Sequence, residues 1–208
     1  MDEKMSSVID ICNLALSHIG QAADVSSIDP PENSIEAEYC ARFYPIARDT
    51  LLEAHAWDFA LRREPLATLK HNSKQWRFCY AVPTECLQII SIFPESAAND
   101  IDCLSVNHAR ETTADGHRII WANTENAIIR YTQRVQNSHL FTPVFTVALS
   151  WKLAAMLAGA IIKSDTGAQY AAMCESQVQS LIAQEKNNDA RQFSQQIEFT
   201  PAAILARQ

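Results

Sequence analysis

The segment 37–66 changes its hydrophobic period part-way along, and this change limits the folds that are open to the chain. Up to His55, apolar or small residues recur in alternating steps of four and three, which places them on one face of a helix. These residues are Cys40, Tyr44, Ala47, Leu51 and Ala54. After His55, Trp57 and Phe59 stand two residues apart, which is the period of a strand. The segment predicts a long helix that passes into an extended segment. Pro45 is expected to kink or break the helix, because it has no backbone N–H to donate.

Start and stop signals place four helices in the chain. The first spans 8–19 and ends at Gly20, a residue that readily adopts the left-handed conformation of a helix stop. The second begins at the run Asp-Pro-Pro-Glu, 29–32, in which the aspartate is expected to cap the helix and a proline to occupy its first turn. The third spans 143–162 and the fourth 167–187, so the helices lie towards the two ends of the chain.

The region 57–139 has the pattern of strands rather than of helices. Candidate strands lie at 76–80, 86–93, 117–122 and 127–135. Asp115-Gly116 is a favourable tight-turn dipeptide, so we expect a hairpin there. Roughly four or five short strands without a helical period indicate a small antiparallel sheet inserted between the second and third helices.

The chain is therefore expected to be mainly α, a four-helix bundle with a small antiparallel β-subdomain inserted between helices 2 and 3 and an extended C-terminal arm. In this division, 1–56 and 140–188 form the bundle, 57–139 the β-subdomain and 189–208 the arm. Apolar residues scattered among glutamines make the arm a candidate for docking on a partner, by strand addition or as a short helix. They are Phe193, Ile197, Phe199, Ile204 and Leu205.

The segment 143–162 is almost wholly apolar and long enough to span a bilayer. Lys152 lies at its centre, where a charge costs roughly 2.5–3.5 kcal/mol in a membrane. We therefore expect a buried helix of a soluble protein and no membrane anchor. The N-terminus is acidic and lacks a hydrophobic segment, so no signal peptide is expected.

The net charge of −7 argues against a protein that grips nucleic acid through its overall field. It does not exclude a protein that lets nucleic acid pass without sticking. Arg62-Arg63 stands next to Glu64, and no basic stripe with interleaved aromatic residues accompanies it. This pair is therefore more typical of a solvated or intersubunit contact than of nucleic-acid binding.

No motif of a catalytic, metal or cofactor site stands out, so none of these sites is expected. The histidines lack metal-ligand spacing, and Cys79 and Cys86 are spaced for core packing rather than for zinc. Six cysteines without a C-x-x-C pair favour free thiols in a reducing compartment. The enzymatic alternative is a cell-wall-cleaving glycosidase, which needs only two carboxylates at a suitable distance. The candidate acids are Glu53, Asp58, Glu64 and Glu85.

Several stretches of the chain resemble the tail tubular protein A family of short-tailed bacteriophages. They are CNLALSHIGQAADVSSID, EAEYCARFYPIARDTLLEAHAWDFALRREPLA, AVPTECLQI, AIIRYTQRV and FTPVFTVALSWKLAAMLA. The resemblance covers roughly residues 8–185 in the family's order, and the tail beyond Asn188 is outside it. Its most specific part is the run RD-x-L-L-E-x-H-x-W-x-F-A, from Arg48 to Ala60.

The resemblance implies a structural protein of the virion rather than an enzyme. Members of this family form a head-to-tail adaptor, a closed ring of about twelve copies beneath the portal protein. The ring meets the tail nozzle protein, seals the packaged genome and forms part of the passage for double-stranded DNA, without sequence-specific binding. Such a protein is made in the cytoplasm of the bacterial host and resides at the head–tail junction of the virion.

The resemblance also gives expected roles to particular residues. The C-terminal arm would contact the portal, and four charged residues become candidate subunit contacts. They are Arg48, Asp49, Arg62 and Arg63. Two alternatives stay open: a muralytic hydrolase carried in the virion, and a non-viral helical scaffold protein that shares only the pattern.

Overall fold

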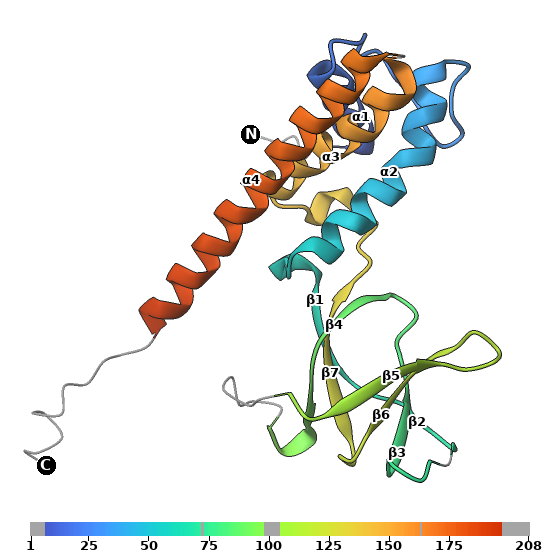
Figure 1. Cartoon of the computed structure of the whole chain (residues 1–208), viewed down its shortest axis with the longest axis vertical. Coiled ribbons are helices and arrows are strands. Elements are labelled where there is room, and N and C mark those ends of the chain that lie inside the picture. The colour runs from blue at the N-terminus through green and yellow to red at the C-terminus, as the bar shows by residue number, and fades with distance from the viewer. Residues whose placement is uncertain (1–6, 72, 98–104, 163, 197–208) are drawn as a thin grey trace, which may run out of the picture. The chain divides into compact units, whose positions relative to one another are not determined.

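The computed structural model describes residues 7–71, 73–97, 105–162 and 164–196 (Figure 1). The chain divides into two compact units. The helical unit comprises Ile9–Tyr44 and Pro143–Gln208, and the sheet unit comprises Met1–Val8 and Pro45–Thr142. The division falls inside the second helix, so the residues of that helix from Pro45 onwards belong to the sheet unit.

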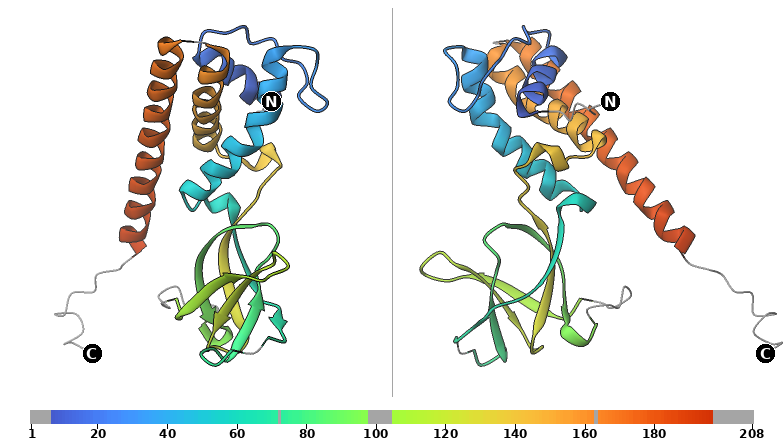
Figure 2. Two further views of the ribbon diagram at one scale, coloured as in Figure 1. Left: turned by 45° about the vertical axis from the view of Figure 1, so that its right-hand side comes forward. Right: turned by 180° about the vertical axis from the view of Figure 1, so that it is seen from behind.

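Four helices contribute to the helical unit: α1 (Val8–His18), α2 (Ile35–Ala54), α3 (Pro143–Ile161) and α4 (Asp165–Gln196). Helices α3 and α4 pack along each other, as two views of the ribbon show (Figure 2). Their apolar faces meet side chains of α1 and the first part of α2 in a core from which water is excluded. The largest side chains that are fully buried there are Ile11, Leu16, Phe145, Leu149, Leu153 and Leu157.

Helix α3 is the one described helix that is long and apolar enough to cross a membrane, and half of its apolar stretch is buried in the structure. Lys152 near its centre places Nζ 2.9 Å from Oε2 of Glu175 on α4. A charge that is neutralised by a neighbouring helix, on a helix with a buried face, is the arrangement of a core helix.

The sequence signals at the helix ends were correct at α1 and wrong at the start of α2. Gly20 follows α1 with a φ of 71°, the left-handed conformation expected of it. Helix α2 begins at Ile35 rather than at the run 29–32, and Oγ of Ser34 accepts a hydrogen bond from the N–H of Ala37 at 3.2 Å. In the run 29–32 the peptide bond before Pro30 is cis and Glu32 accepts bonds from Ser26, so the run forms a turn. Serine 34 is therefore the cap of α2.

A kink or a break was expected at Pro45, and helix α2 continues through it to Ala54, so the chain does not break there. Proline removes one backbone hydrogen bond, and the buried residues on both sides of it hold the helix together. They are Ala37, Cys40, Tyr44, Ala47, Leu51 and Leu52.

The strands of the sheet unit form two antiparallel sheets. The first has the order β1-β7-β4, with β1 at Leu61–Pro65, β7 at Ala127–Gln133 and β4 at Cys86–Pro94. The second has the order β2-β3-β6-β5, and its strands are Thr68–Leu69, Phe78–Ala81, Arg118–Ala122 and His108–Thr112 in that order. Short 3-10 helices lie at Asp58–Ala60, Glu95–Ala97 and Ser138–Leu140. The predicted hairpin at Asp115-Gly116 is confirmed, with Gly116 at a φ of 82°.

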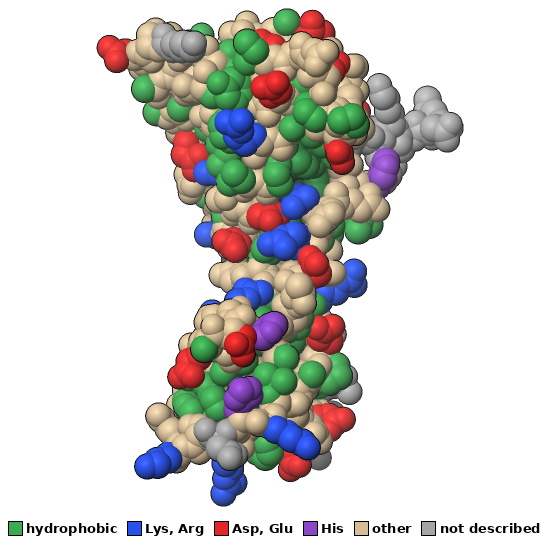
Figure 3. Space-filling view, turned by 90° about the vertical axis from the view of Figure 1, so that its right-hand side faces the viewer, with side chains coloured by type: hydrophobic (Ala, Val, Ile, Leu, Met, Phe, Trp, Pro, Cys, Tyr) green, Lys and Arg blue, Asp and Glu red, His purple; other side chains and the backbone are tan. Residues whose placement is uncertain are grey.

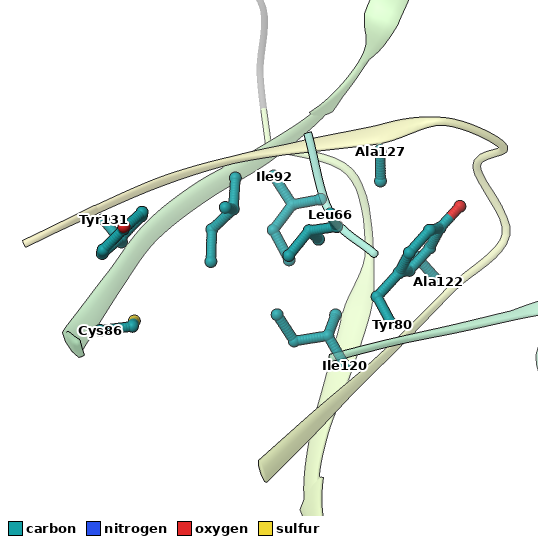
Figure 4. Packing of buried hydrophobic residues seen from close by; sticks show 9 residues of the cluster. Leu66, Tyr80, Cys86, Ile92, Ile120, Ala122, Ala127 and Tyr131 are labelled. Carbon is teal, nitrogen blue, oxygen red and sulfur yellow. The ribbon is translucent and has the colours of Figure 1, made fainter. Parts of the chain in front are cut away.

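The two sheets share one core (Figure 4). Its residues come from strands of both sheets and from the segments next to them: Leu66, Tyr80, Cys86, Ile92, Ile120, Ala122, Ala127, Ile129 and Tyr131. Successive side chains of a strand point to opposite faces, so Ile120 enters this core while Ile119 and Trp121 pack with Cys79 on the other face of the same sheet. Strand β6 is therefore apolar on both faces.

The prediction of a mainly α four-helix bundle with a small β-subdomain is wrong. Beside the four helices, the described residues form two antiparallel sheets, of three and four strands. The sequence patterns missed β1 and β2, because β1 is exposed along most of its length and has no alternation of apolar and polar residues. Two sheets with a core of their own make this an α+β fold.

The extended arm expected from residue 189 onwards is also corrected, because α4 continues to Gln196. Phe193 therefore lies on a helix. The other four arm residues lie outside the described residues: Ile197, Phe199, Ile204 and Leu205.

Candidate functional site

Four charged side chains of the sheet unit form a continuous series of ion pairs, here called the charge network: Arg48, Asp49, Glu85 and Arg134. The guanidinium of Arg48 lies 2.8 Å from Oδ1 of Asp49, and Nε of Arg134 lies 2.8 Å from the other carboxylate oxygen. Arg134 also reaches Glu85 at 4.0 Å, and its backbone N–H donates to the Glu85 carbonyl at 2.8 Å. Only 8% of Arg48 is exposed. A charge so far from water needs its partner, so Asp49 holds the second part of α2 against the end of β7.

The indole of Trp57 closes the C-terminal end of α2. Its Nε1–H donates to the carbonyl of Leu51 at 2.9 Å, which satisfies one of the last carbonyls of the helix. The ring is 4% exposed and meets the imidazole of His55 edge-on at a centroid distance of 5.0 Å. Phe59 packs in turn on Phe141 at 5.7 Å. The predicted extended segment holds at Trp57, whose backbone is extended, and is wrong at Phe59, because 58–60 form a 3-10 helix and the strand begins at Leu61.

Arg62 and Arg63 lie on β1, an edge strand of its sheet. Nε of Arg62 donates to the side-chain oxygen of Gln133 at 2.7 Å, while the guanidinium of Arg63 lies 5.5 Å from the centre of the Phe93 ring. Both arginines are exposed. Charged side chains on an edge strand disfavour uncontrolled pairing with another chain. The four candidate subunit contacts thus fall into two groups. Arg48 and Asp49 belong to the charge network and have their partners within the chain, whereas Arg62 and Arg63 are exposed on the edge strand β1.

The carboxylates of the enzymatic alternative lie in different surroundings. Glu53 and Asp58 are exposed near the end of α2, and Glu85 belongs to the charge network. Glu64 accepts a hydrogen bond from the hydroxyl of Tyr131 at 3.3 Å. Burial, reinforced by the charge of Glu64, raises the pKa of Tyr131 to about 12, so this hydroxyl stays protonated and donates. Within the described ranges, no three His, Cys, Asp or Glu side chains are grouped so that they could hold a metal ion.

The cysteines that the structure describes are free and buried: Cys12, Cys40, Cys79, Cys86 and Cys174. Cys79 and Cys86 belong to different apolar clusters of the sheet unit, as core packing requires. Cys12 of α1 contacts Cys40 of α2, and this thiol–thiol contact together with burial raises the pKa of Cys12. The same contact lowers the pKa of Cys40, whereas burial raises the pKa of Cys79, Cys86 and Cys174. A protonated, buried thiol is a poor nucleophile, so the cysteines with a raised pKa act as small apolar residues.

Two arginines cover the open edge of β4. Arg110 donates to the carbonyl of Ile89 at 3.3 Å, and Arg118 donates to the carbonyl of Cys86. Both side chains come from the second sheet and line a small hollow of about 290 Å³. They satisfy backbone acceptors of an edge strand, which explains their position without a ligand.

A further candidate site, which the sequence patterns did not single out, lies on the loop between β2 and β3. A cavity of about 540 Å³, here called the loop pocket, is lined by His71, Ser73, Lys74, Gln75, Trp76, Arg77 and Asn123. This volume falls within the range of about 300–1,000 Å³ that is typical of small-molecule sites. The sequence carried a signal for it: no acid occurs between Glu64 and Glu85, whereas Lys70, Lys74 and Arg77 do.

No protein-family model matches this sequence, and no curated protein is significantly similar to it. Function is therefore inferred from the geometry of the chain and from the motifs quoted above.

Proposed function

We propose that this chain is a structural protein of a bacteriophage virion, a subunit of the head-to-tail adaptor ring of a short-tailed phage. In this role copies of the chain form a ring of about twelve that joins the portal to the tail nozzle and surrounds part of the DNA passage. The protein has no catalytic task there.

The observation that carries the proposal is the position of the run Arg48–Ala60, the most specific part of the resemblance. Arg48 and Asp49 open the charge network, and Trp57 binds back to Leu51 at the end of the helix. The residue types that mark the family are thus the ones that join α2 to β7 and close the end of α2 within the sheet unit. This supports a shared local structure over a chance match of helical pattern.

The charge of the chain fits the same role. A net charge of −7 gives no overall attraction for a polyanion, so DNA would move along such a wall without binding tightly. Adaptor subunits also need contacts with their neighbours in the ring. Arg62 and Arg63, exposed on the edge strand β1, are the candidates for these contacts.

Native mass spectrometry of the purified protein, alone and mixed with the portal protein of the same phage, tests the proposal. The expected result is a complex of portal with about twelve copies of this chain. A chain that stays monomeric and never binds portal would contradict the adaptor role. Clearing of peptidoglycan by the purified protein, abolished by Glu53→Gln, would instead indicate a muralytic hydrolase.

A further inference from the structure

Basic side chains cluster at the loop pocket, although the chain as a whole is acidic. Lys74, Arg77 and His71 line the pocket, and Lys70 precedes it on the same loop. Figure 3 shows Lys and Arg side chains projecting at the lower end of the view, where β2 and β3 lie in Figure 1. Neither Lys74 nor Arg77 forms an ion pair within the part of the chain that the structure describes. Their positive charges are therefore available to a ligand.

The backbone under these cations is fixed by side-chain hydrogen bonds. Oγ of Ser73 accepts from the N–H groups of Gln75 and Trp76 at 3.2 and 3.3 Å, which closes a turn. The Asn123 side-chain oxygen accepts from the N–H of Arg77 at 3.0 Å, and the ladder between β3 and β6 begins at the next residue. The Ser73 end of this stretch is thus closed by a local turn, and the Arg77 end is tied to Asn123 next to β6. A preorganised site loses little conformational entropy when a ligand binds.

Trp76 adds a flat aromatic surface beside the cations. It is half-buried, because part of its ring packs against the cluster of Cys79, Ile119 and Trp121. The indole also lines the loop pocket, so its remaining surface is open to a ligand. A cationic rim next to an aromatic ring is the combination with which proteins hold the phosphate and the unstacked base of single-stranded nucleic acid.

The other polar groups of the pocket narrow the choice of ligand. Among the described residues the lining holds the positive charges of Lys74 and Arg77 and no carboxylate, so it favours an anionic ligand over a neutral one. Duplex DNA keeps its bases stacked inside the helix, out of reach of Trp76. An acidic peptide would satisfy the cations but leave the ring without a partner. A nucleotide satisfies both features.

We propose that the loop pocket binds single-stranded nucleic acid, with a phosphate held by Lys74 and Arg77 and a base stacked on Trp76. The site lies on one loop of the sheet unit and does not rest on the adaptor function. The cavity has room for one or two nucleotides, so contact with about two phosphates is expected.

Fluorescence anisotropy of a labelled oligothymidylate with the full-length protein tests the proposal. Binding should weaken between about 50 and about 200 mM salt, with a slope of log K against log salt near −1.4 for two phosphates. Lys74→Glu should weaken binding about tenfold or more at the lower salt concentration and make the slope shallower by about 0.7. Lys186→Glu is the matched control, since this lysine is exposed on α4 and outside the loop pocket. It should bind like the parent.

The base contact needs its own variants. Trp76→Ala should weaken oligothymidylate binding roughly 5- to 150-fold, the range for loss of one stacking contact. Trp76→Phe keeps a ring and should recover most of the affinity, and circular dichroism verifies that both variants are folded. Equal binding of duplex DNA or of poly-glutamate would overturn the proposal. The proposal would also be overturned if both Lys74→Glu and Trp76→Ala bound oligothymidylate with the affinity of the parent.

Discussion

At the scale of single residues, Trp57 combines a polar and an apolar role. Its N–H satisfies a carbonyl at the end of α2, and its ring fills the space between His55 and Phe59. Replacement by alanine removes both, so Trp57→Ala should lower the free energy of unfolding by about 3–5 kcal/mol. Trp57→Phe keeps a ring and loses mainly the hydrogen bond, which is worth about 1 kcal/mol. Urea unfolding monitored by circular dichroism gives both values, and an unchanged midpoint in the alanine variant would refute this role.

His18 should make the stability of the helical unit depend on pH. Its ring stacks on Trp151 at a centroid distance of 3.5 Å, and its Nε2 lies 3.0 Å from Oγ of Ser150, which itself donates to a backbone carbonyl. Burial lowers the pKa of His18 below its ordinary value of about 6.5. The unfolded chain then binds more protons than the folded one below that pH. The stabilising contribution is therefore full above the ordinary pKa and is lost as the pH falls below it.

His18→Gln should consequently flatten the decrease in the free energy of unfolding when the pH falls from above to below about 6.5. Glutamine keeps a hydrogen-bond donor but does not titrate. Urea unfolding across this pH range measures the slope, and His117→Gln serves as control because that histidine is exposed on a turn. The explanation fails if the free energy of unfolding of His18→Gln depends on pH as that of the parent does, while the pH dependence disappears in His117→Gln.

At the scale of elements, two residues are possible N-caps of α2. Ser34 makes the capping bond in the structure, whereas Asp29 is the cap that the sequence pattern favours. Loss of a serine cap costs about 0.5–2 kcal/mol. Ser34→Ala should therefore lower the free energy of unfolding by this amount, and Asp29→Ala should leave it nearly unchanged. Thermal or urea unfolding of the two variants decides between them, and the reverse order of effects would place the helix start at Asp29.

Elements with a strong periodic pattern could be predicted from the sequence, and elements shaped by exposure or polar contacts could not. The sequence correctly places α1, α3 and β4, because their apolar residues recur with a clear period or form a run between turn residues. Strand β1 has the sequence LRREP and is exposed, so its only signal is its pairing with β7, which lies far along the chain. Helix α4 runs beyond 187 through polar residues, where the apolar stripe has ended. Polar helix turns leave no periodic signal.

The candidate sites follow the same rule. Arg48 was a candidate subunit contact, and the structure buries it beside Asp49, which also pairs with Arg134, 85 residues further along. A contact over that distance cannot be derived from spacing. The loop pocket is different, since the absence of acids around Lys74 and Trp76 is visible in the sequence. That Asn123 faces this loop could be learned only from the fold.

At the scale of the whole molecule, the class of the fold depends on how many strands pair rather than on how strong each pattern is. Each unit buries its own apolar residues, and both contribute fully buried side chains such as Leu153 and Ile129. In a mainly α protein, the sheets would contribute only a small part of the buried core. Sheets of three and four strands that share a core instead make the sheet unit a folded body in its own right.

The proposed adaptor function assigns portal binding to the C-terminal segment, and a truncation tests this at the scale of the assembly. Deletion of residues 197–208 leaves α4 intact and removes four apolar residues of the expected arm: Ile197, Phe199, Ile204 and Leu205. The truncated protein should melt at the same temperature as the parent yet no longer join portal-filled heads in a co-sedimentation assay. Serine at those four positions in the full-length chain should have the same effect, because apolar contacts drive the docking of such segments.

A chain that lacks only residues 206–208 is the matched control for this truncation, since it keeps all four apolar residues and should sediment with the heads as the parent does. Attachment of the longer truncation at parental affinity would assign portal binding to another surface. The contact between copies has a separate test at the exposed arginines of β1, because Arg62→Glu and Arg63→Glu change the charge of an edge strand without removing core side chains. Loss of ring formation in those two variants, with unchanged melting, would place the contact between copies on β1.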